Sequence, residues 1–356
     1  MGTCNQENVT RKRYRLEVSC SRNRKPQYYL AKNVKYKDKQ TKVKIYIGSG
    51  NSPPSIDELE EFREKNAFKL EMMAAIKRAQ LSSASYKSKY LSRSMVHIIE
   101  EVRALHRTLK NLLTINELKI YEKNLEISYV HGTVSIEGNT LSLKETRDLF
   151  INKIYPKDKS LRVINEAQNF KQVINYRNNF KAKITLNFIK NLHARIMNNI
   201  DDESAGAFRR TDLIGIEGCE IRLCPSIEIE SELKNIIYHY YTRLDEGYHP
   251  FEEAILFHHD FEMIHPFSDG NGRVGREVLN FMLMREGYPK LLLGYPREDY
   301  IQALELGDEE KYAEMVISFS GLIAKQYRNL LEKWIAEAVQ PHKRTGQLRL
   351  ADFAEV

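Results

Sequence analysis

Hydrophobic and polar residues follow two different patterns along the chain. Within the first fifty residues, three segments rich in Tyr, Val and Ile are separated by Asn, Lys and Gly, which is typical of short strands. These segments are RYRLEVS, PQYYLAKNVKY and KVKIYIG. From about residue 93 onward, apolar residues recur at three- and four-residue spacing, which predicts helices. The sequence therefore predicts a small β-rich module followed by a mainly helical domain.

The junction between these patterns is rich in turn-forming residues. GSGNSPPSIDE ends the strand pattern, and Ser55 lies three residues before Glu58, which is the spacing of a helix capping box. Helical composition continues to about residue 80, and the polar segment SSASYKSKYLSRS is typical of a linker. We therefore divide the chain into a basic β-rich module (1–50), a helix and linker (51–92), a helical domain (93–340) and a C-terminal tail (341–356).

The helical domain is expected to be a bundle with one β interruption. Its helices are predicted at roughly 93–110, 115–137, 142–151, 160–179, 185–199, 227–246, 250–264, 272–286 and 308–339. Pro250 suits the first turn of the helix FEEAILFHHDFEMI. The interruption is DLIGIEGCEIRL, where two short β-like runs flank Glu217-Gly218 and predict an inserted hairpin.

Composition excludes several classes of protein. Hydrophobic content of 42% with 29% charged residues is ordinary for a globular protein in water. No apolar run approaches the roughly 18 residues of a membrane span, and MGTCNQENVTRKRYR lacks the apolar stretch of a secretion signal. The four cysteines form no CxxC pair, so neither a zinc framework nor a disulfide scaffold is indicated. We expect a cytoplasmic protein without membrane attachment.

The excess positive charge is concentrated at the N-terminus. Residues 1–50 contain 13 Lys and Arg against 3 Asp and Glu, whereas the rest of the chain is slightly acidic. A small basic β-module could hold an acidic partner, with DNA or RNA as the obvious candidate. The alternative is a small sheet whose lysines only protect its exposed edges. The sequence leaves both interpretations open.

One segment concentrates residues suited to phosphate chemistry. HPFSDGNGRVGR runs from His265 to Arg276 and contains a G-x-G-x-x-G spacing. A Rossmann fingerprint requires an apolar strand directly before the glycines, but EMIHPFSD precedes them here. A kinase glycine loop has Val two positions after the last glycine, where this chain has Glu277. The context excludes both common glycine loops.

The segment instead has the character of a loop leading into the helix EVLNFMLMRE. Backbone N–H groups around Gly270, Asn271 and Gly272 would lie at a helix N-terminus, where the helix dipole favours an anion. Arg273 and Arg276 are three residues apart on one helix face, so both could address the same anion. Two arginines beside such a backbone nest suit a polyphosphate.

Two further side chains flank this nest. Asp269 supplies a hard oxygen ligand suited to Mg²⁺ that bridges phosphates. His265 titrates near neutral pH and could accept a proton there. The segment therefore combines a base, a metal ligand and an anion site.

This segment matches the Fic signature H-x-F-x-[DE]-G-N-G-R-x-x-R at every specified position. Roughly residues 93–330 resemble the Fic family, which implies a helical domain that transfers AMP from ATP to a hydroxyl side chain of a target protein. By this resemblance, Mg²⁺ on Asp269 and the backbone nest hold the α- and β-phosphates, and Asn271 helps to orient them. His265 then acts as the base.

A second segment fits the inhibitory pattern [ST]-x-x-x-E-[GN] of Fic proteins. Thr133-Val-Ser-Ile-Glu137-Gly138 lies N-terminal to the core motif. By resemblance, Glu137 pairs with Arg276 and occupies the space of the ATP γ-phosphate, because a carboxylate mimics one phosphate and binds guanidinium in a fork. The alternative is an ordinary helix C-terminus, where Gly138 or Asn139 caps the helix and Glu137 is solvated.

The resemblance also gives the hairpin and its neighbours a role. Fic proteins carry a flap at this place, so Leu213, Ile214, Gly215 and Ile216 are expected to dock an extended target segment through main-chain hydrogen bonds. A purely structural hairpin is the alternative. His258, His259 and Asp260 are interpreted as helix packing rather than as a metal cluster, and Phe267 as a core anchor for the loop.

Several functions remain open from sequence. The protein that receives AMP is unidentified, and it could be this chain itself, which could also form a homo-oligomer. Removal of AMP from the same target, with Glu137 orienting water, is one alternative to transfer. Another is a regulator whose basic module binds nucleic acid while the Fic core acts as a nucleotide-controlled switch.

Overall fold

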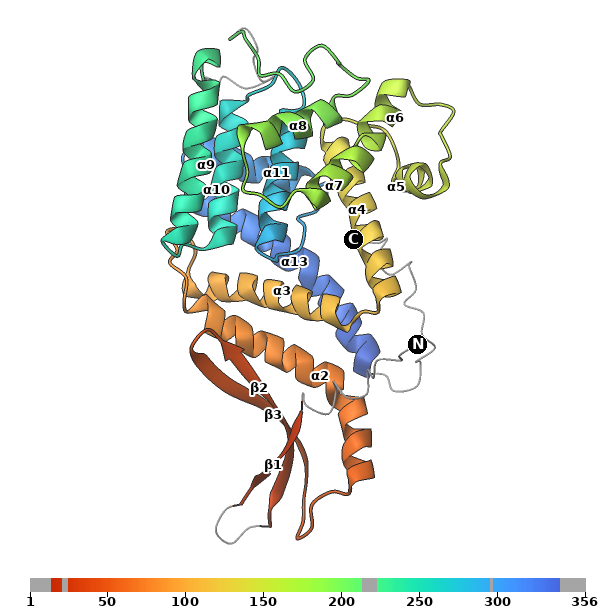
Figure 1. Ribbon diagram of the computed structural model, residues 1–356, viewed down its shortest axis with the longest axis vertical. Coiled ribbons are helices and arrows are strands. Elements are labelled where there is room, and N and C mark those ends of the chain that lie inside the picture. Colours follow the sequence, from red (N-terminus) through yellow and green to blue (C-terminus); the bar gives the residue numbers. More distant parts are fainter. Residues whose placement is uncertain (1–13, 21–24, 213–222, 295–296, 340–356) are drawn as a thin grey trace. The chain divides into compact units, whose positions relative to one another are not determined.

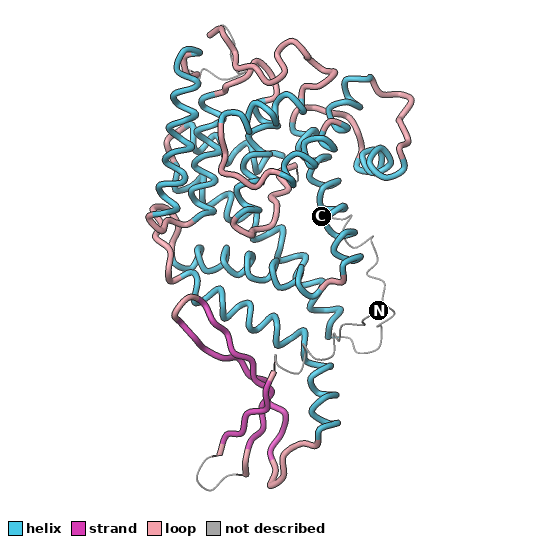
Figure 2. Tube along the Cα trace, in the orientation of Figure 1, coloured by secondary structure: helices cyan, strands magenta, loops and turns pink. Residues whose placement is uncertain are grey.

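The structure is a computed structural model that describes residues 14–20, 25–212, 223–294 and 297–339. The described residues form two compact units. The first contains residues up to 85, together with 100–112 and 328–339. The second contains residues 86–99 and 113–327. The three expected strands and a mainly helical remainder are confirmed, as the magenta and cyan segments of Figure 2 show.

The first unit is built on a three-stranded antiparallel sheet and a long helix. Its elements are β1 (Arg15–Ser19), β2 (Gln27–Tyr36), β3 (Lys39–Ser49) and α2 (Ile56–Ser83), together with most of α3 (Arg93–Leu112), in the strand order β1-β2-β3. The expected capping box at the start of α2 is confirmed, since Ser55 and Glu58 exchange hydrogen bonds. Leu30 from the sheet and Leu70 from α2 are fully buried in one core, and each contributes about 1.5–3 kcal/mol of transfer free energy.

The second unit is a bundle of helices (Figure 1). It contains α4 (Ile115–Ile136), α5 (Leu143–Arg147), the π-helical turn η1 (Asp148–Asn152), α6 (Leu161–Gln168), α7 (Phe170–Asn179), α8 (Leu186–Ile196), the 3-10 turn η2 (Ser226–Glu228), α9 (Ile229–Asp245), α10 (Pro250–Ile264), α11 (Asn271–Arg285), α12 (Arg297–Asp308) and the first part of α13 (Tyr312–Val339). Pro250 occupies the first turn of α10, as expected.

Helices α10 and α11 form the centre of this bundle and position the glycine-rich loop. Most of their residues are buried, including Phe251 and Phe261 on α10 and Val278 on α11. A helix that is covered on every side belongs in the interior of a domain. The six residues from 265 to 270 connect the two helices, so the loop that carries the motif is held by two rigid central elements.

Three predicted helices differ in the structure. The expected helix 160–179 is two helices, divided at Asn169, whose side-chain amide donates to the carbonyls of Ile196 and Asn198 at the end of α8. The expected helix 142–151 continues from α5 into a π-helical turn, which ends at Lys153 in the left-handed region. The expected helix 308–339 is wrong at its start, because α12 was missed and Glu310, with φ 61°, separates it from α13.

The described residues lack two features, a membrane-spanning helix and a cluster of metal-binding side chains. In the described part of the chain, no helix is long and apolar enough to cross a membrane. The described residues also contain no group of three or more His, Cys, Asp and Glu side chains that could hold a metal ion. His258 and His259 are buried in helix packing, as expected, whereas Asp260, which was expected to share that role, is exposed. The predicted flap residues Leu213 to Ile216 lie outside the described residues.

Candidate active site

His265 lies at the point where α10 ends. Its backbone adopts the left-handed conformation (φ 48°, ψ 61°), which is uncommon for a residue with a side chain. Its Nδ1 lies 3.3 Å from the carbonyl oxygen of Glu262, so Nδ1–H donates and the lone pair of Nε2 stays available. Burial lowers the pKa of His265 below its usual value, and the bond to the Glu262 carbonyl only partly opposes this. The imidazole is therefore neutral at neutral pH, as a general base requires.

The loop after His265 is fastened by Phe267 and Asn271. The Asn271 amide accepts the Phe267 N–H through Oδ1 and donates to the Phe267 carbonyl through Nδ2, both at 2.8 Å. Phe267 is fully buried and stacks on His193 with a ring separation of 3.7 Å, which confirms it as a core anchor. The Asn271 side chain is thus used for loop geometry, whereas we expected it to orient phosphates; its backbone N–H still lies in the first turn of α11.

His193 on α8 is a second brace, and the sequence analysis missed it. Its Nδ1 accepts the N–H of Gly206 at 2.9 Å, so its Nε2 carries the proton and donates to the Asp269 carbonyl at 3.0 Å. Burial is the main cause that lowers the pKa of His193 to about 4. The ring therefore stays neutral and keeps one tautomer, which fixes the backbone of the loop immediately before its glycines.

Arg209 is a third brace that the sequence analysis missed. Its side chain is fully buried and donates to the carbonyls of His265 at 2.8 Å and Thr211 at 3.1 Å. It also donates to the Asp212 carboxylate at 3.0 Å and to the Cys224 carbonyl. One guanidinium thus holds the backbone of His265 and both ends of the segment where the hairpin was expected.

The N-terminus of α11 requires glycine at two positions. Gly270 precedes the helix with φ 80°, a left-handed conformation that suits glycine. A side-chain carbon at Gly272 would lie 2.6 Å from Oε1 of Glu137, which is too close for any real contact. Glycine therefore lets the Glu137 carboxylate approach the first turn of α11, where the helix dipole favours negative charge.

Arg276 is held by two residues of the second sequence motif. It is 2% exposed, and its Nη2 donates to Glu137 Oε1 at 2.6 Å and to the Thr133 carbonyl at 3.0 Å. Its Nε donates to Thr133 Oγ1 at 2.8 Å. Burial opposes ionisation of Glu137, but the Arg276 charge outweighs it and lowers the pKa of this carboxyl. The pairing that the resemblance implied is therefore present in the structure.

The Glu137 segment shows features of both interpretations, a carboxylate paired with Arg276 and an ordinary helix C-terminus. Glu137 ends α4, and Gly138 follows in the left-handed conformation with φ 83°. The N–H groups of Gly138 and Asn139 donate to the carbonyls of Ser135 and Val134. The segment is an ordinary helix C-terminus, yet its last carboxylate is paired rather than solvated.

Asp269 is held by two arginines at the entrance to the nest. Arg273 donates to its Oδ1 at 2.9 Å and Arg162, from α6, donates to its Oδ2 at 3.0 Å. Burial raises the pKa of Asp269, but the Arg273 charge and the Gly270 N–H outweigh it, so the net pKa is lowered. Among the described residues, Nε and Nη1 of the buried Arg273 have no hydrogen-bond partner. These N–H groups suit a phosphate, because a buried donor without a partner is costly.

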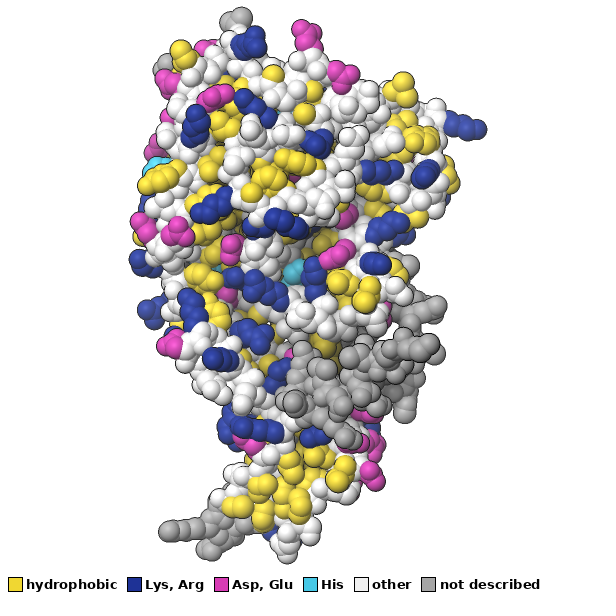
Figure 3. Space-filling view, in the orientation of Figure 1, with side chains coloured by type: hydrophobic (Ala, Val, Ile, Leu, Met, Phe, Trp, Pro, Cys, Tyr) yellow, Lys and Arg dark blue, Asp and Glu magenta, His cyan; other side chains and the backbone are white. Residues whose placement is uncertain are grey.

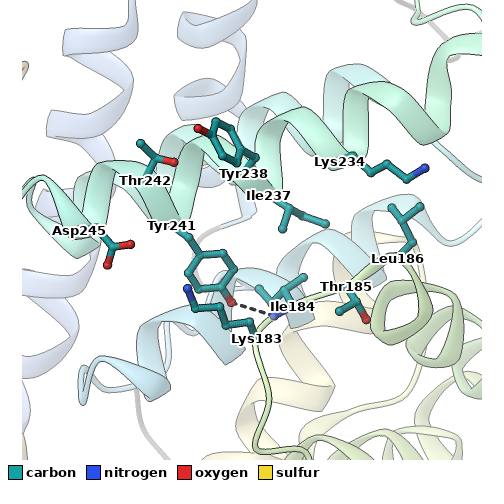
Figure 4. A pocket seen from close by; sticks show the side chains of 10 residues that line it. All are labelled: Lys183, Ile184, Thr185, Leu186, Lys234, Ile237, Tyr238, Tyr241, Thr242 and Asp245. Atoms are coloured by element: carbon teal, nitrogen blue, oxygen red, sulfur yellow. Dashed lines mark hydrogen bonds between the residues drawn. The ribbon is translucent and has the colours of Figure 1, made fainter.

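A surface hollow of about 570 Å³ lies elsewhere in the second unit, between the start of α8 and α9 (Figure 4). Its wall includes Tyr241, whose hydroxyl accepts the N–H of Ile184 at 2.8 Å, and Lys183, which lies 4.6 Å from the Tyr241 ring. The residues that line this hollow include no member of either sequence motif. The hollow is therefore separate from the residues of both motifs.

Comparison with protein families agrees with the loop geometry. Residues 183–283 match the sequence model of the Fic/DOC family. The chain contains a Fic domain. The matched range includes His193 and Arg209, the two braces that lie outside the Fic signature. Neither carried a sequence signal, since a histidine on an apolar helix face and an arginine before a hairpin are both common.

Curated relatives of this Fic domain carry the name protein adenylyltransferase. The chain is 31% identical over 211 residues to "Protein adenylyltransferase Fic" of Aedes aegypti, covering 56% of this chain and 41% of that protein. It is 28% identical over 246 residues to "Protein adenylyltransferase fic-1" of Caenorhabditis elegans, covering 67% and 47%. The chain thus spans less than half the length of these two relatives.

Solved structures share the fold. Fic-1 (aa134 - 508) from C. elegans superposes with a TM-score of 0.61 at 23% identity, covering 79% of this chain and 87% of that chain. A Fic domain containing signaling protein from Bacteroides thetaiotaomicron gives 0.60 at 21% identity, covering 68% and 100%. These likenesses confirm a Fic-type helical fold.

Proposed function

We propose that this chain is a protein adenylyltransferase, which transfers AMP from ATP to a Ser, Thr or Tyr hydroxyl of a protein, and that Glu137 holds it in an inhibited state. The observation that carries the proposal is the contact of Glu137 and Thr133 with Arg276, the last residue of the complete motif. The names of the curated relatives support the same activity.

Each reactive residue of the motif has a separate role in the proposed reaction. Nε2 of His265 removes the proton from the acceptor hydroxyl, and the hydroxyl oxygen attacks the α-phosphorus of ATP. The bond between the α-phosphorus and the bridging oxygen breaks, and its electron pair leaves with pyrophosphate. Arg273 and Arg276 neutralise charge on this leaving group. Most of the acceleration comes from positioning and electrostatic stabilisation, as in other phosphoryl-type transfers.

The donor set at the nest fits Mg²⁺ only together with the nucleotide. Mg²⁺ is commonly bound by one or two carboxylates plus substrate phosphates. Asp269 offers one carboxylate, whose side chain is 42% exposed. It lies beside two N–H groups of Arg273 that have no hydrogen-bond partner among the described residues. Asp269 would have to exchange its bonds to Arg162 and Arg273 for the metal. When bound, the metal would offset phosphate charge.

Glu137 inhibits by occupying the partner that the γ-phosphate needs. Its carboxylate pairs with Arg276 and lies against Gly272 at the N-terminus of α11. A γ-phosphate directed at Arg276 would meet this carboxylate at close range, so ATP can bind only with its phosphates displaced. An α-phosphorus that is out of line with the hydroxyl cannot react efficiently.

The proposal is tested by labelling with ATP that carries ³²P on its α-phosphorus. The Glu137→Gly variant, incubated alone and with a cell lysate, should label protein, whereas Glu137→Gly/His265→Ala should not. ATP binding should be similar in both variants, because the base acts on the hydroxyl and not on the nucleotide. Loss of ATP binding in the double variant would make His265 structural and overturn its assigned role. If wild type instead removes AMP from a labelled target and Glu137→Gly cannot, the reverse reaction is the function.

A further inference from the structure

The three-stranded sheet has two chemically different faces. Cross-strand partners point to the same face, and successive residues along a strand point to opposite faces. Leu30 is paired with Leu16 and Ile45 in one row, and the fully buried Leu30 packs against α2. The next row pairs Arg15 with Ala31 and Lys44. This second row therefore points away from α2.

The face that points away from α2, here called the outer sheet face, is basic. Its cations are Arg15, Lys35, Lys42 and Lys44, and all four are exposed. Glu17 is the carboxylate that shares this face within the described strands, and it bonds Lys42 at 2.8 Å and Arg15 at 2.9 Å. The hydrogen bond from Lys42 is the main cause that lowers the pKa of Glu17. One carboxylate offsets only one of four cations, so the face retains positive charge.

The outer sheet face also carries an aromatic pair between its cations. Tyr29 and Tyr46 are cross-strand partners whose rings meet edge to face with centroids 5.5 Å apart. Lys44 lies 4.7 Å from the Tyr29 ring, and Tyr46 remains 50% exposed. Figure 3 shows hydrophobic side chains, coloured yellow, gathered at the surface over the strands in that view. Lysines that only kept an edge soluble would not need exposed tyrosines beside them.

We propose that the outer sheet face binds duplex DNA in its major groove. The major groove of B-DNA is about 12 Å wide and admits a two-stranded β-ribbon. The two long strands of the sheet, β2 and β3, form such a ribbon. β2 and β3, of 10 and 11 residues, extend about 30 Å and can follow the groove over several base pairs. The deep, narrow major groove of duplex RNA does not admit such a sheet.

Each part of the outer sheet face has a distinct contact with the DNA. The cations Lys35, Lys42 and Lys44 neutralise phosphates on the groove walls, which gives affinity without sequence preference. Tyr29 and Tyr46 present aromatic surface to the base edges between those walls. The site is independent of the proposed transfer reaction, because no residue of the Fic signature belongs to the sheet.

The test measures binding of the full chain to a fluorescein-labelled DNA duplex of about 20 base pairs by anisotropy, at several KCl concentrations. The Lys42→Ala/Lys44→Ala variant is compared with Lys65→Ala/Lys69→Ala, which removes the same charge from exposed positions on α2. Removal of two phosphate contacts should weaken binding on the order of 10-fold or more, and make the slope of log K against log [KCl] shallower by about two. The α2 control should stay close to wild type.

A third variant separates the contribution of the aromatic contact to DNA binding from that of the positive charge. Tyr46→Ala should weaken binding several-fold and leave the salt slope unchanged, since no cation is removed. Circular dichroism confirms that each variant keeps the fold. Equal losses in the two lysine variants would overturn the proposal, because binding would then follow net charge alone. It would be overturned equally by absence of binding at about 50 mM KCl, or by tighter binding of an RNA duplex of the same sequence.

Discussion

Substitution of the buried Arg209 tests whether one side chain organises the backbone around the proposed base. Arg209→Lys keeps the positive charge but replaces a planar fork of five donors with a single nitrogen. The arginine donates to the carbonyls of His265 and Thr211 at 2.8 and 3.1 Å, and also to that of Cys224. Its bond to Asp212 contributes little, because that carboxylate is 62% exposed. A fourth carbonyl, that of Ile264, accepts at 3.3 Å. A lysine cannot serve all four.

The magnitude follows from the acceptors that lose their donor. Two of these carbonyls left without a donor cost about 1–3 kcal/mol each, so the variant should lose roughly 2–6 kcal/mol. For a unit of about 200 residues this lowers Tm by roughly 4–24 °C. The assay is thermal unfolding, monitored by circular dichroism. The matched control is Arg210→Lys, which makes the same substitution at the neighbouring, exposed residue. Equal Tm values for the two variants would refute the bracing role of Arg209.

Two further predictions concern the loop in the Glu137→Gly background. Asp269→Asn should abolish the transfer that Mg²⁺ supports and weaken binding of Mg-ATP, as titrations of rate against Mg²⁺ would measure. An unchanged titration would contradict the metal role. Since burial lowers the pKa of His265 below the ordinary 6.5 and the base acts only when unprotonated, the transfer rate should be level at neutral pH and fall only below pH 6.5. A rate that falls with a midpoint above 6.5 would contradict the assigned environment of His265.

Local patterns in the sequence predicted the three strands and most of the helices, and they located the residues of the motif. Strand alternation, the Ser55–Glu58 capping box and the position of Pro250 depend on residues that are close in sequence, and all three are confirmed. The motif from His265 to Arg276 likewise sits in one continuous loop and helix turn. Interactions of this range leave a pattern that a single sequence can display.

The supports of the site could not be predicted in this way. Arg209 reaches the His265 carbonyl across 56 residues, and His193 reaches the Asp269 carbonyl across 76. Nothing in the neighbouring sequence distinguishes these residues from ordinary buried side chains. The side-chain amide of Asn169 likewise serves carbonyls at the end of another helix. The roles of Arg209, His193 and Asn169 all depend on how segments that are distant in sequence pack together.

The central claim is that Glu137 restrains the motif by holding Arg276, and the most direct test is the rate of label transfer from α-³²P-ATP. Glu137→Gly should be faster than wild type on the order of 10²-fold, since displacement of a reacting atom by about 1 Å costs that much. Arg276→Ala in the same background should lose the gain, because the released guanidinium is what repositions the phosphates. Equal label incorporation by wild type and Glu137→Gly would contradict the account and leave Glu137 as a carboxylate that only ends a helix.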